Sequence, residues 1–292
     1  IIVRVPIAPN IPTRYLTCLL ECAGNSRVAV QPPVEGLLWD HGGVSNARWG
    51  GVPVSAILER AGLRSGVLEV LFEGADAGKE RGTDAVAHYA MSLPMDRAMH
   101  PDTLLAYEMN GEQLTPVHGY PLRLITPGWY GMASVKWLTS IRVIDYPFKG
   151  FHQSDYYVFQ KAGPAEGKAP IRVTTMRVKS LITTPGRGEA LPTGINTIRG
   201  VAWSGTGPVL QVEVSVDSGQ TWRQARVQAS PSSYSWQQWE SRWEVNQPGY
   251  YLLWARATDA EGNTQPDQAP WNFRGFANNS IHVVPVQVRA TG

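Results

Sequence analysis

The residue best suited to chemistry in this chain is Cys22, which ends the apolar run RYLTCLLEC and precedes the small residues of CAGN. Small residues there allow the backbone to approach a bound group closely. Arg27, five residues further on, would lower the pKa of a thiol if the chain folded back beside it. These residues alone leave two interpretations open, a reactive metal-binding thiolate and an inert buried cysteine.

The second cysteine, Cys18, is not expected to bridge Cys22. In a strand, residues four apart are separated by roughly 13 Å, whereas a disulfide requires Cα atoms within about 7 Å. Two cysteines without a nearby third cysteine or histidine also fail the pattern of a structural zinc site. We therefore predict two free thiols.

Three positive side chains lie in loops rich in Gly, Pro and Trp: Arg123 in HGYPLRLITPG, Lys136 in GWYGMASVKW and Arg274 in WNFRGFANN. Each alone is typical of a solvated surface charge, but such loops commonly hold a ligand. A helix beginning near Lys136 would add an anion-binding N-terminus. His118 fits a general base, a metal ligand or a packed core histidine, and Asp76 in FEGADAG fits a turn.

Several functional classes are excluded or disfavoured. No apolar run approaches the roughly 20 residues of a membrane span, and a net charge of +2 favours neither DNA nor an anionic membrane. The sequence contains no G-x-S-x-G, no P-loop and no G-x-G-x-x-G that opens a helix. A thiol hydrolase built on Cys22 and His118 would leave the arginines unexplained and lacks the local signature of that class.

The elements that must position these residues differ along the chain. The first part predicts a helix over 53–61, where apolar residues recur at helical spacing between Pro53 and Gly62. Two further short helices are expected over 94–99 and 134–138. An opening strand is expected in IIVRVPIA. Further strands are expected at 14–21, 67–73, 104–108, 121–125 and 139–145.

The part from residue 172 is predicted to be mostly strand. Val212, Val214 and Val216 alternate with polar neighbours, and the turn at 217–219 follows them. A strand and turn recur through YYLLWARATDAEGN. Short strands with regular turns over about 115 residues favour an immunoglobulin-like sandwich, whose core we expect most tryptophans to fill. The Pro/Gly/Ala-rich stretch 161–170 is expected to connect the two parts.

Taken together, the segments ECAGNSR, VSNARWGGVPVSAILERAGL, HGYPLRLITPGWYGMASVKWL and WNFRGFANN resemble the sulfite oxidase family of molybdopterin enzymes. The resemblance covers nearly the whole chain and extends to VAWSGTGPV and SVDSGQTW. It implies an α+β mixed molybdopterin-binding domain over 1–165, followed by an all-β immunoglobulin-like sandwich over 172–292 that serves dimerisation.

The resemblance also implies roles for individual residues. Cys22 would be the thiolate ligand of molybdenum, and the groups around the substrate would be Arg27, Trp49, Tyr156 and Arg274. The molybdenum–molybdopterin cofactor would be held by Asp76, His118, Arg123, Ser134, Val135 and Lys136. A soft thiolate suits a redox metal, and guanidinium groups suit an oxyanion.

The implied activity is the oxidation of sulfite to sulfate, and the implied assembly is a homodimer that passes electrons to a separate cytochrome. The family's upstream segment with an Arg-Asn-His type motif is absent before Cys22, so we expect an N-terminally truncated chain, with a periplasmic location favoured. Neither a haem nor a flavin domain is recognisable. The alternatives are a related molybdopterin enzyme for another oxyanion or a sulfoxide, and a non-catalytic partner subunit of a sulfur-oxidising complex.

Overall fold

The computed structural model describes residues 11–79, 84–159 and 170–290. The chain divides into two compact units that alternate along the sequence. The first comprises the described residues up to Ala23 together with Val44–Thr174 and Asn272–Phe276, and the second comprises Gly24–Gly43, Thr175–Trp271 and the described residues from Ala277. The strand expected in IIVRVPIA and positions 161–169 of the expected connection lie outside the described residues.

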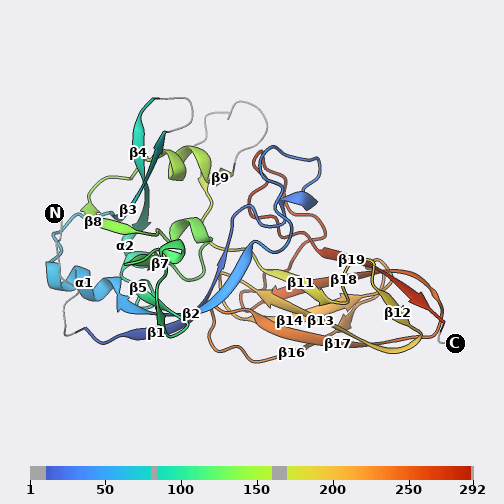
Figure 1. Ribbon diagram of the computed structural model, residues 1–292. Coiled ribbons are helices and arrows are strands. Elements are labelled where there is room, and N and C mark those ends of the chain that lie inside the picture. The colour runs from blue at the N-terminus through green and yellow to red at the C-terminus, as the bar shows by residue number, and fades with distance from the viewer. Residues whose placement is uncertain (1–10, 80–83, 160–169, 291–292) are drawn as a thin grey trace. The chain divides into compact units, whose positions relative to one another are not determined.

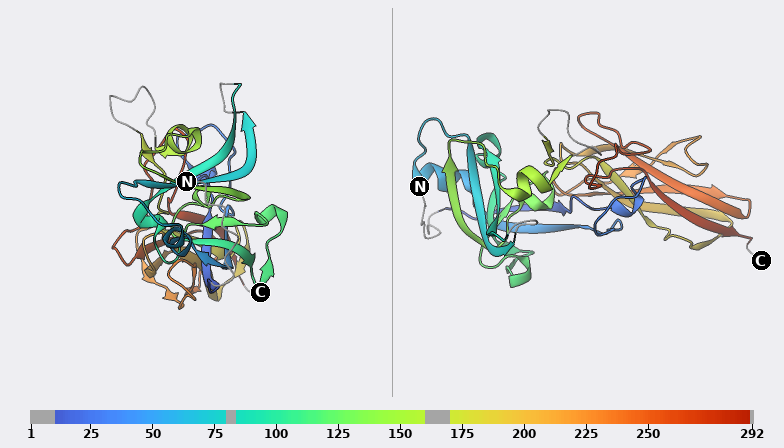
Figure 2. Two further views of the ribbon diagram at one scale, coloured as in Figure 1. Left: turned by 90° about the vertical axis from the view of Figure 1, so that its left-hand side faces the viewer. Right: turned by 90° about the horizontal axis from the view of Figure 1, so that it is seen from above.

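The first unit is built on antiparallel sheets (Figure 1). In the larger one the order is β1-β2-β5-β6, and β7 also pairs with β5; its strands are Arg14–Glu21, Val44–Pro53, Leu104–Met109, Glu112–Gln113 and Arg123–Ile125. A second sheet has the order β4-β3-β8, with strands Val86–Pro94, Glu69–Lys79 and Leu138–Ile144; its cyan and green strands can be followed in Figure 2. The pair β9 and β10 spans Val158–Phe159 and Ile171–Arg172.

Two short helices accompany these sheets, as expected. Helix α1, Val54–Ala61, buries its apolar face and ends at Gly62, whose φ of 75° favours glycine. Helix α2, Met95–Ala98, follows Pro94. Among the described residues, no helix is long and apolar enough to cross a membrane.

The helix predicted over 134–138 is wrong. A 3₁₀ turn occupies Gly131–Ala133, and the chain then runs beside β7. The Ser134 hydroxyl accepts the N–H of Thr126 at 3.1 Å, and the Val135 carbonyl accepts the N–H of Leu124 at 2.8 Å. Pairing with a neighbouring strand therefore overrides the local helical pattern, and Lys136 has no helix N-terminus beside it.

The second unit is a β-sandwich, which confirms the immunoglobulin-like architecture. One sheet has the order β11-β13-β17-β16, with strands Lys179–Thr184, Gly194–Trp203, Gln237–Val245 and Arg226–Val227. The other has the order β12-β19-β18-β14-β15, with strands Ala190–Pro192, His282–Arg289, Gly249–Asp259, Val209–Ser215 and Arg223–Gln224. Pairing is antiparallel except between β12 and β19.

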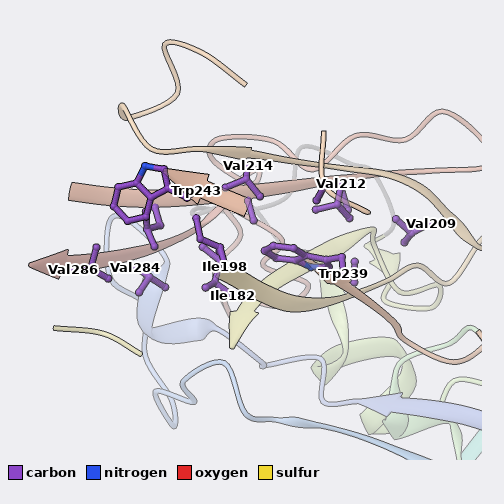
Figure 3. Packing of buried hydrophobic residues seen from close by; sticks show 14 of the residues in the cluster. Ile182, Ile198, Val209, Val212, Val214, Trp239, Trp243, Val284 and Val286 are labelled. Carbon is purple, nitrogen blue, oxygen red and sulfur yellow. The ribbon is translucent and has the colours of Figure 1, made fainter. Parts of the chain in front are cut away.

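The core of this sandwich is formed by alternating side chains from both sheets (Figure 3). Val212 and Val214 of β14 are buried, as their alternation predicted, and Trp239 and Trp243 of β17 fill the interior. Trp239 requires a glycine opposite: a methyl group on Gly200 would lie 2.3 Å from its ring and 2.1 Å from a backbone carbonyl oxygen. Aromatic packing and strand pairing thus fix this region together.

Candidate active site

Cys22 is the first residue after β1, and its exposed thiol is free. The pairing of β1 with β2 runs to the partners Glu21 and Val44 and stops there. Cys22 therefore lies just beyond the paired part of β1, within which Cys18 is fully buried. The position therefore leaves the Cys22 sulfur available to a ligand.

Cys18 contrasts with Cys22 although the two are four residues apart. It is fully buried, and burial raises the pKa of its thiol to about 12. Its Sγ donates to the Leu19 carbonyl at 3.3 Å. Both cysteines are free, which confirms the prediction that they form no disulfide, and Cys18 has the character of an inert core residue.

The turn at Gly131 packs against the end of β1. A methyl group on Gly131 would lie 3.3 Å from the carbonyl oxygen of Glu21, the residue before Cys22. The hydroxyl of Tyr89 donates to the Met132 carbonyl at 2.7 Å and holds this turn from β4. The segment that continues into Ser134–Lys136 thus begins beside the candidate metal ligand.

Arg123, at the start of β7, is a buried cation with 6% exposure. Its Nη1 donates to the His118 carbonyl at 2.9 Å and its Nη2 to the Ser134 carbonyl at 3.3 Å, while its Nε has no hydrogen-bond partner among the described residues. The guanidinium carbon lies 4.8 Å from the ring centre of Trp49. Burial lowers the pKa of Arg123 to about 10, so the group stays charged at neutral pH.

Trp49 is 2% exposed, and its indole N–H donates to the Cys18 carbonyl at 3.2 Å. The structure therefore places Trp49 in the interior, between β1 and Arg123. The role of Trp49 beside the substrate, which the resemblance implied, stays a prediction.

Lys136 and Arg123 approach each other around Gly119. This glycine has a φ of 102°, and a methyl group on it would lie 3.0 Å from the Lys136 side chain and 3.2 Å from that of Arg123. The Lys136 ammonium donates to the Val117 carbonyl at 3.2 Å. Burial and the charge of Arg123 lower the pKa of Lys136, while Asp76 opposes the shift. Two cations thus share one small region, a common requirement for binding an anionic group.

Asp76 lies in an irregular part of β3, where the register with β4 shifts between Glu73 and Ala77. Its carboxylate oxygen would be 2.5 Å from a methyl group on Gly74, and the Lys136 carbonyl would be 2.7 Å from the same methyl. Bulges redirect side chains near functional sites. The structure therefore brings all six predicted cofactor residues to one region of the first unit: Asp76, His118, Arg123, Ser134, Val135 and Lys136.

Tyr156 and Arg274 form a second cluster of the first unit. Tyr156 ends the π-helical turn His152–Tyr156, and the Arg274 guanidinium carbon lies 4.5 Å from the centre of its ring. The ring of Phe276 also packs edge-on against Tyr156, with centroids 5.8 Å apart. Such turns are rare and often mark functional sites. Residues separated by more than a hundred positions are thereby joined in a cation–π contact.

Arg27 belongs to the second unit, within Gly24–Gly43. It is 7% exposed, and its Nη1 donates to the Leu37 carbonyl at 2.7 Å. A methyl group on Gly24 would lie 2.5 Å from Nη2 of this guanidinium. The glycine of the CAGN segment therefore leaves the space that the Arg27 guanidinium occupies.

Sequence reasoning overlooked three residues that shape the first cluster: Tyr89, Gly119 and Gly131. The two glycines stand within the motif HGYPLRLITPGWYGMASVKWL, so their place in the motif was the available signal. No signal in the sequence marks Tyr89, because its role depends on a hydrogen bond to a residue 43 positions away.

Comparisons with known proteins agree with this geometry. Residues 8–152 match the oxidoreductase molybdopterin binding domain, and residues 171–289 match the Mo-co oxidoreductase dimerisation domain. Sulfite oxidase of Gallus gallus is 38% identical over 93% of this chain and 62% of its own length. Nitrate reductase [NADH] 1 of Arabidopsis thaliana is 37% identical over 92% of this chain and 32% of its own length.

A solved structure extends the likeness to three dimensions. The sulfane dehydrogenase SoxCD of Paracoccus pantotrophus aligns with a TM-score of 0.81 and 30% identity, over 94% of this chain and 69% of that one. The chain spans less than two thirds of the length of the chicken enzyme and about half that of the human one. Two matching domains and a shared fold establish that the chain belongs to the sulfite oxidase family of molybdopterin-dependent oxidoreductases.

Proposed function

We propose that the protein oxidises sulfite to sulfate at a molybdenum centre to which Cys22 contributes the thiolate. One observation carries the proposal: the exposed Cys22 thiol follows β1 beside the turn that leads into a cluster of cations around Arg123. Among the described residues, no three His, Cys, Asp or Glu side chains group as a metal site. A single protein thiolate fits a metal whose remaining ligands belong to its own cofactor.

The residues around Arg123 fit the anionic part of such a cofactor. The buried guanidinium forms no salt bridge among the described residues and has an unpaired Nε, and a buried cation of this kind favours an anion. We assign Arg123, Lys136 and His118 to the phosphate, and Asp76 with the backbone of Ser134 and Val135 to the pterin. Trp49 would act as the packing support of Arg123.

Arg274 and Tyr156 would bind the substrate. A guanidinium donates parallel hydrogen bonds to an oxyanion, and contact with the Tyr156 ring restricts the direction of the Arg274 side chain. The Tyr156 hydroxyl would donate a hydrogen bond close to the reacting oxygen. Arg27 follows Cys22 by five residues, and its assignment to the substrate rests on the family resemblance.

When bound, the cofactor supplies the two-electron oxidation in which sulfite and water yield sulfate, two protons and two electrons. The electrons require an acceptor, for which we propose a separate cytochrome. We also propose a homodimer formed through the second unit, supported by its match to the dimerisation domain.

The test is molybdenum analysis of the purified protein combined with steady-state assays using sulfite and ferricyanide. The proposal expects stoichiometric molybdenum and sulfite-dependent reduction of ferricyanide. Metal-loaded protein that does not oxidise sulfite would refute the activity, and protein that takes up no molybdenum under conditions that load the chicken enzyme would favour a non-catalytic partner subunit.

Nitrate reduction is the second candidate, because a plant nitrate reductase is nearly as similar as the sulfite oxidases. Both substrates are small oxyanions that guanidinium groups bind. Assays with reduced viologen and nitrate, run beside the sulfite assay on one preparation, separate the two candidates through the ratio of kcat/KM values.

A further inference from the structure

The backbone that carries Arg27 has an unusual conformation. Ser26 adopts left-handed backbone angles, with φ of 66° and ψ of 21°, immediately before the 3₁₀ turn Arg27–Ala29. A serine in this region is uncommon and persists where surrounding contacts over-determine it. The direction of the Arg27 side chain therefore depends on what holds Ser26.

Three polar groups of Ser26 are engaged within the second unit. Its N–H donates to the Asp40 carbonyl at 3.1 Å, and its carbonyl accepts the amide of Asn278 at 2.7 Å. Its Oγ lies 2.7 Å from Nδ1 of His41. Of these partners, only the His41 side chain can be removed without changing the backbone or the WNFRGFANN motif.

His41 is in turn packed against His282 of β19. The ring centroids are 4.3 Å apart and the planes meet at 57°. Nδ1 of His282 accepts the N–H of Ile182 in β11 at 3.0 Å, so that nitrogen carries no hydrogen and the ring is neutral. The His282 side chain thus accepts a hydrogen bond from β11 and packs against the ring of His41.

Burial and the cations that face the pair oppose its protonation, whereas the Asp40 carboxylate, 3.5 Å from Nε2 of His41, favours it. Lys179 is 2% exposed, and its ammonium lies 3.5 Å from the Asn25 carbonyl. Burial, Lys179 and Arg187 lower the pKa of His41 to about 4, against the attraction of Asp40. Burial, His41 and Arg187 lower the pKa of His282 to about 3. A neutral pair is a directional hydrogen-bonding and packing unit, not a charge.

We propose that His41 is a positioning residue for Arg27, acting through its hydrogen bond to the Ser26 hydroxyl while His282 supports its ring. His41 need not touch substrate in this role. Its effect on sulfite depends on the proposed function of Arg27 as a substrate-binding group, whereas its effect on the Arg27 side chain does not.

The first test measures Arg27 itself. Phenylglyoxal labelling of Arg27, followed by mass spectrometry in the holoprotein, should be slow in the wild type and at least about 5-fold faster in His41→Phe and Ser26→Ala. His41→Asn, whose amide can replace Nδ1, should restore slow labelling, and His88→Phe at an exposed histidine of β4 is the matched control. Unchanged labelling in both His41→Phe and Ser26→Ala overturns the inference; Ser26→Ala keeps the test open if His41→Phe misfolds.

The second test concerns the substrate. His41→Phe and Ser26→Ala should each raise the KM for sulfite about 10-fold, with kcat changed less than about 3-fold. The double variant should be no worse than either single one, and sulfate binding should weaken by the same factor. If the two substitutions speed the labelling of Arg27 but the wild-type holoprotein does not oxidise sulfite, the proposed function is refuted and the positioning role of His41 stands. Additive effects of the two substitutions on the KM for sulfite would refute the coupling between His41 and Ser26.

Discussion

Arg123 in the first unit and Asp259 in the second are both buried charges, but their surroundings differ. Asp259 is 1% exposed and accepts hydrogen bonds from Ser204 at 2.7 Å, Thr206 at 2.7 Å and the backbone and amide of Asn263. Burial alone would raise the pKa of Asp259, but these hydrogen bonds outweigh burial and lower it. Arg123 has two carbonyl acceptors, and its Nε has no partner in the part of the chain that the structure describes.

The difference separates a charge that completes the fold from one that awaits a ligand. A buried charge with its hydrogen bonds satisfied stabilises the structure around it. A buried guanidinium without a carboxylate costs folding free energy unless an anion binds. Substitutions in the first region should therefore change cofactor binding more than stability, and those in the second should do the reverse.

The largest effect is expected for Cys22→Ser. Activity should fall by more than the about 10–100-fold that loss of an outer-shell partner costs, because the substitution removes the metal ligand itself. Cys18→Ala, in the core four residues earlier, should retain kcat per molybdenum and lose stability instead. Turnover of Cys22→Ser near the wild-type rate, measured with sulfite and ferricyanide, would remove Cys22 from the metal.

Arg123→Met is expected to lower the molybdopterin content of the purified protein about 10-fold or more. In cofactor-free protein its free energy of unfolding should stay within about 1 kcal/mol of the wild type or rise, since an apolar side chain replaces an unpaired cation. Arg48→Met, at an exposed arginine of β2, is the control. A loss of about 3 kcal/mol in the free energy of unfolding, with normal cofactor content, would show that Arg123 stabilises the fold as Asp259 does and would contradict its assignment to the cofactor.

Asp259→Ala should lower the free energy of unfolding by about 2–4 kcal/mol, because several buried donors lose their acceptor. Cofactor content per folded molecule should not change. Urea denaturation checks the first expectation, and Asp267→Ala at an exposed position should cost less than about 0.5 kcal/mol. Equal stability of the two variants would contradict the structural role.

The smallest effect concerns pH in the second unit. The folded-state pKa values of His41 and His282 lie below the ordinary 6.5, so the unfolded chain binds protons first as pH falls. Stability from this source is complete above about pH 6.5 and is lost toward pH 4, by at most about 1.4 kcal/mol per pH unit for each histidine. Urea midpoints between pH 7 and 5 measure it, and a slope unchanged in His282→Gln would exclude the pair as its origin.

Periodic patterns made most of the fold predictable. The alternation of Val212 and Val214 and the helical spacing of Val54, Ile57 and Leu58 each depend on one buried face. The helix predicted over 134–138 did not form, because Val135 accepts a hydrogen bond from Leu124 of β7 and Ser134 accepts one from Thr126, directly after β7. Local spacing carries no information about such a partner.

The candidate site was predictable only through motifs. Residue types alone left Arg123 a surface charge, and the structure shows it buried against Trp49. The contact between Tyr156 and Arg274 joins loops 118 positions apart, as their numbers show. The assignment of Cys22 and Arg27 to different units could not be read from a sequence in which they are five residues apart.

The close approach of Gly200 to the Trp239 ring bears on how this chain can evolve. Even a methyl group at position 200 would need to displace both an indole ring and a backbone carbonyl. We therefore expect the fold to tolerate no single substitution of Gly200. A saturation library at position 200, selected for folded protein, should return glycine codons alone, even where Trp239 is also replaced by a smaller residue, because the backbone carbonyl would still block the added side chain.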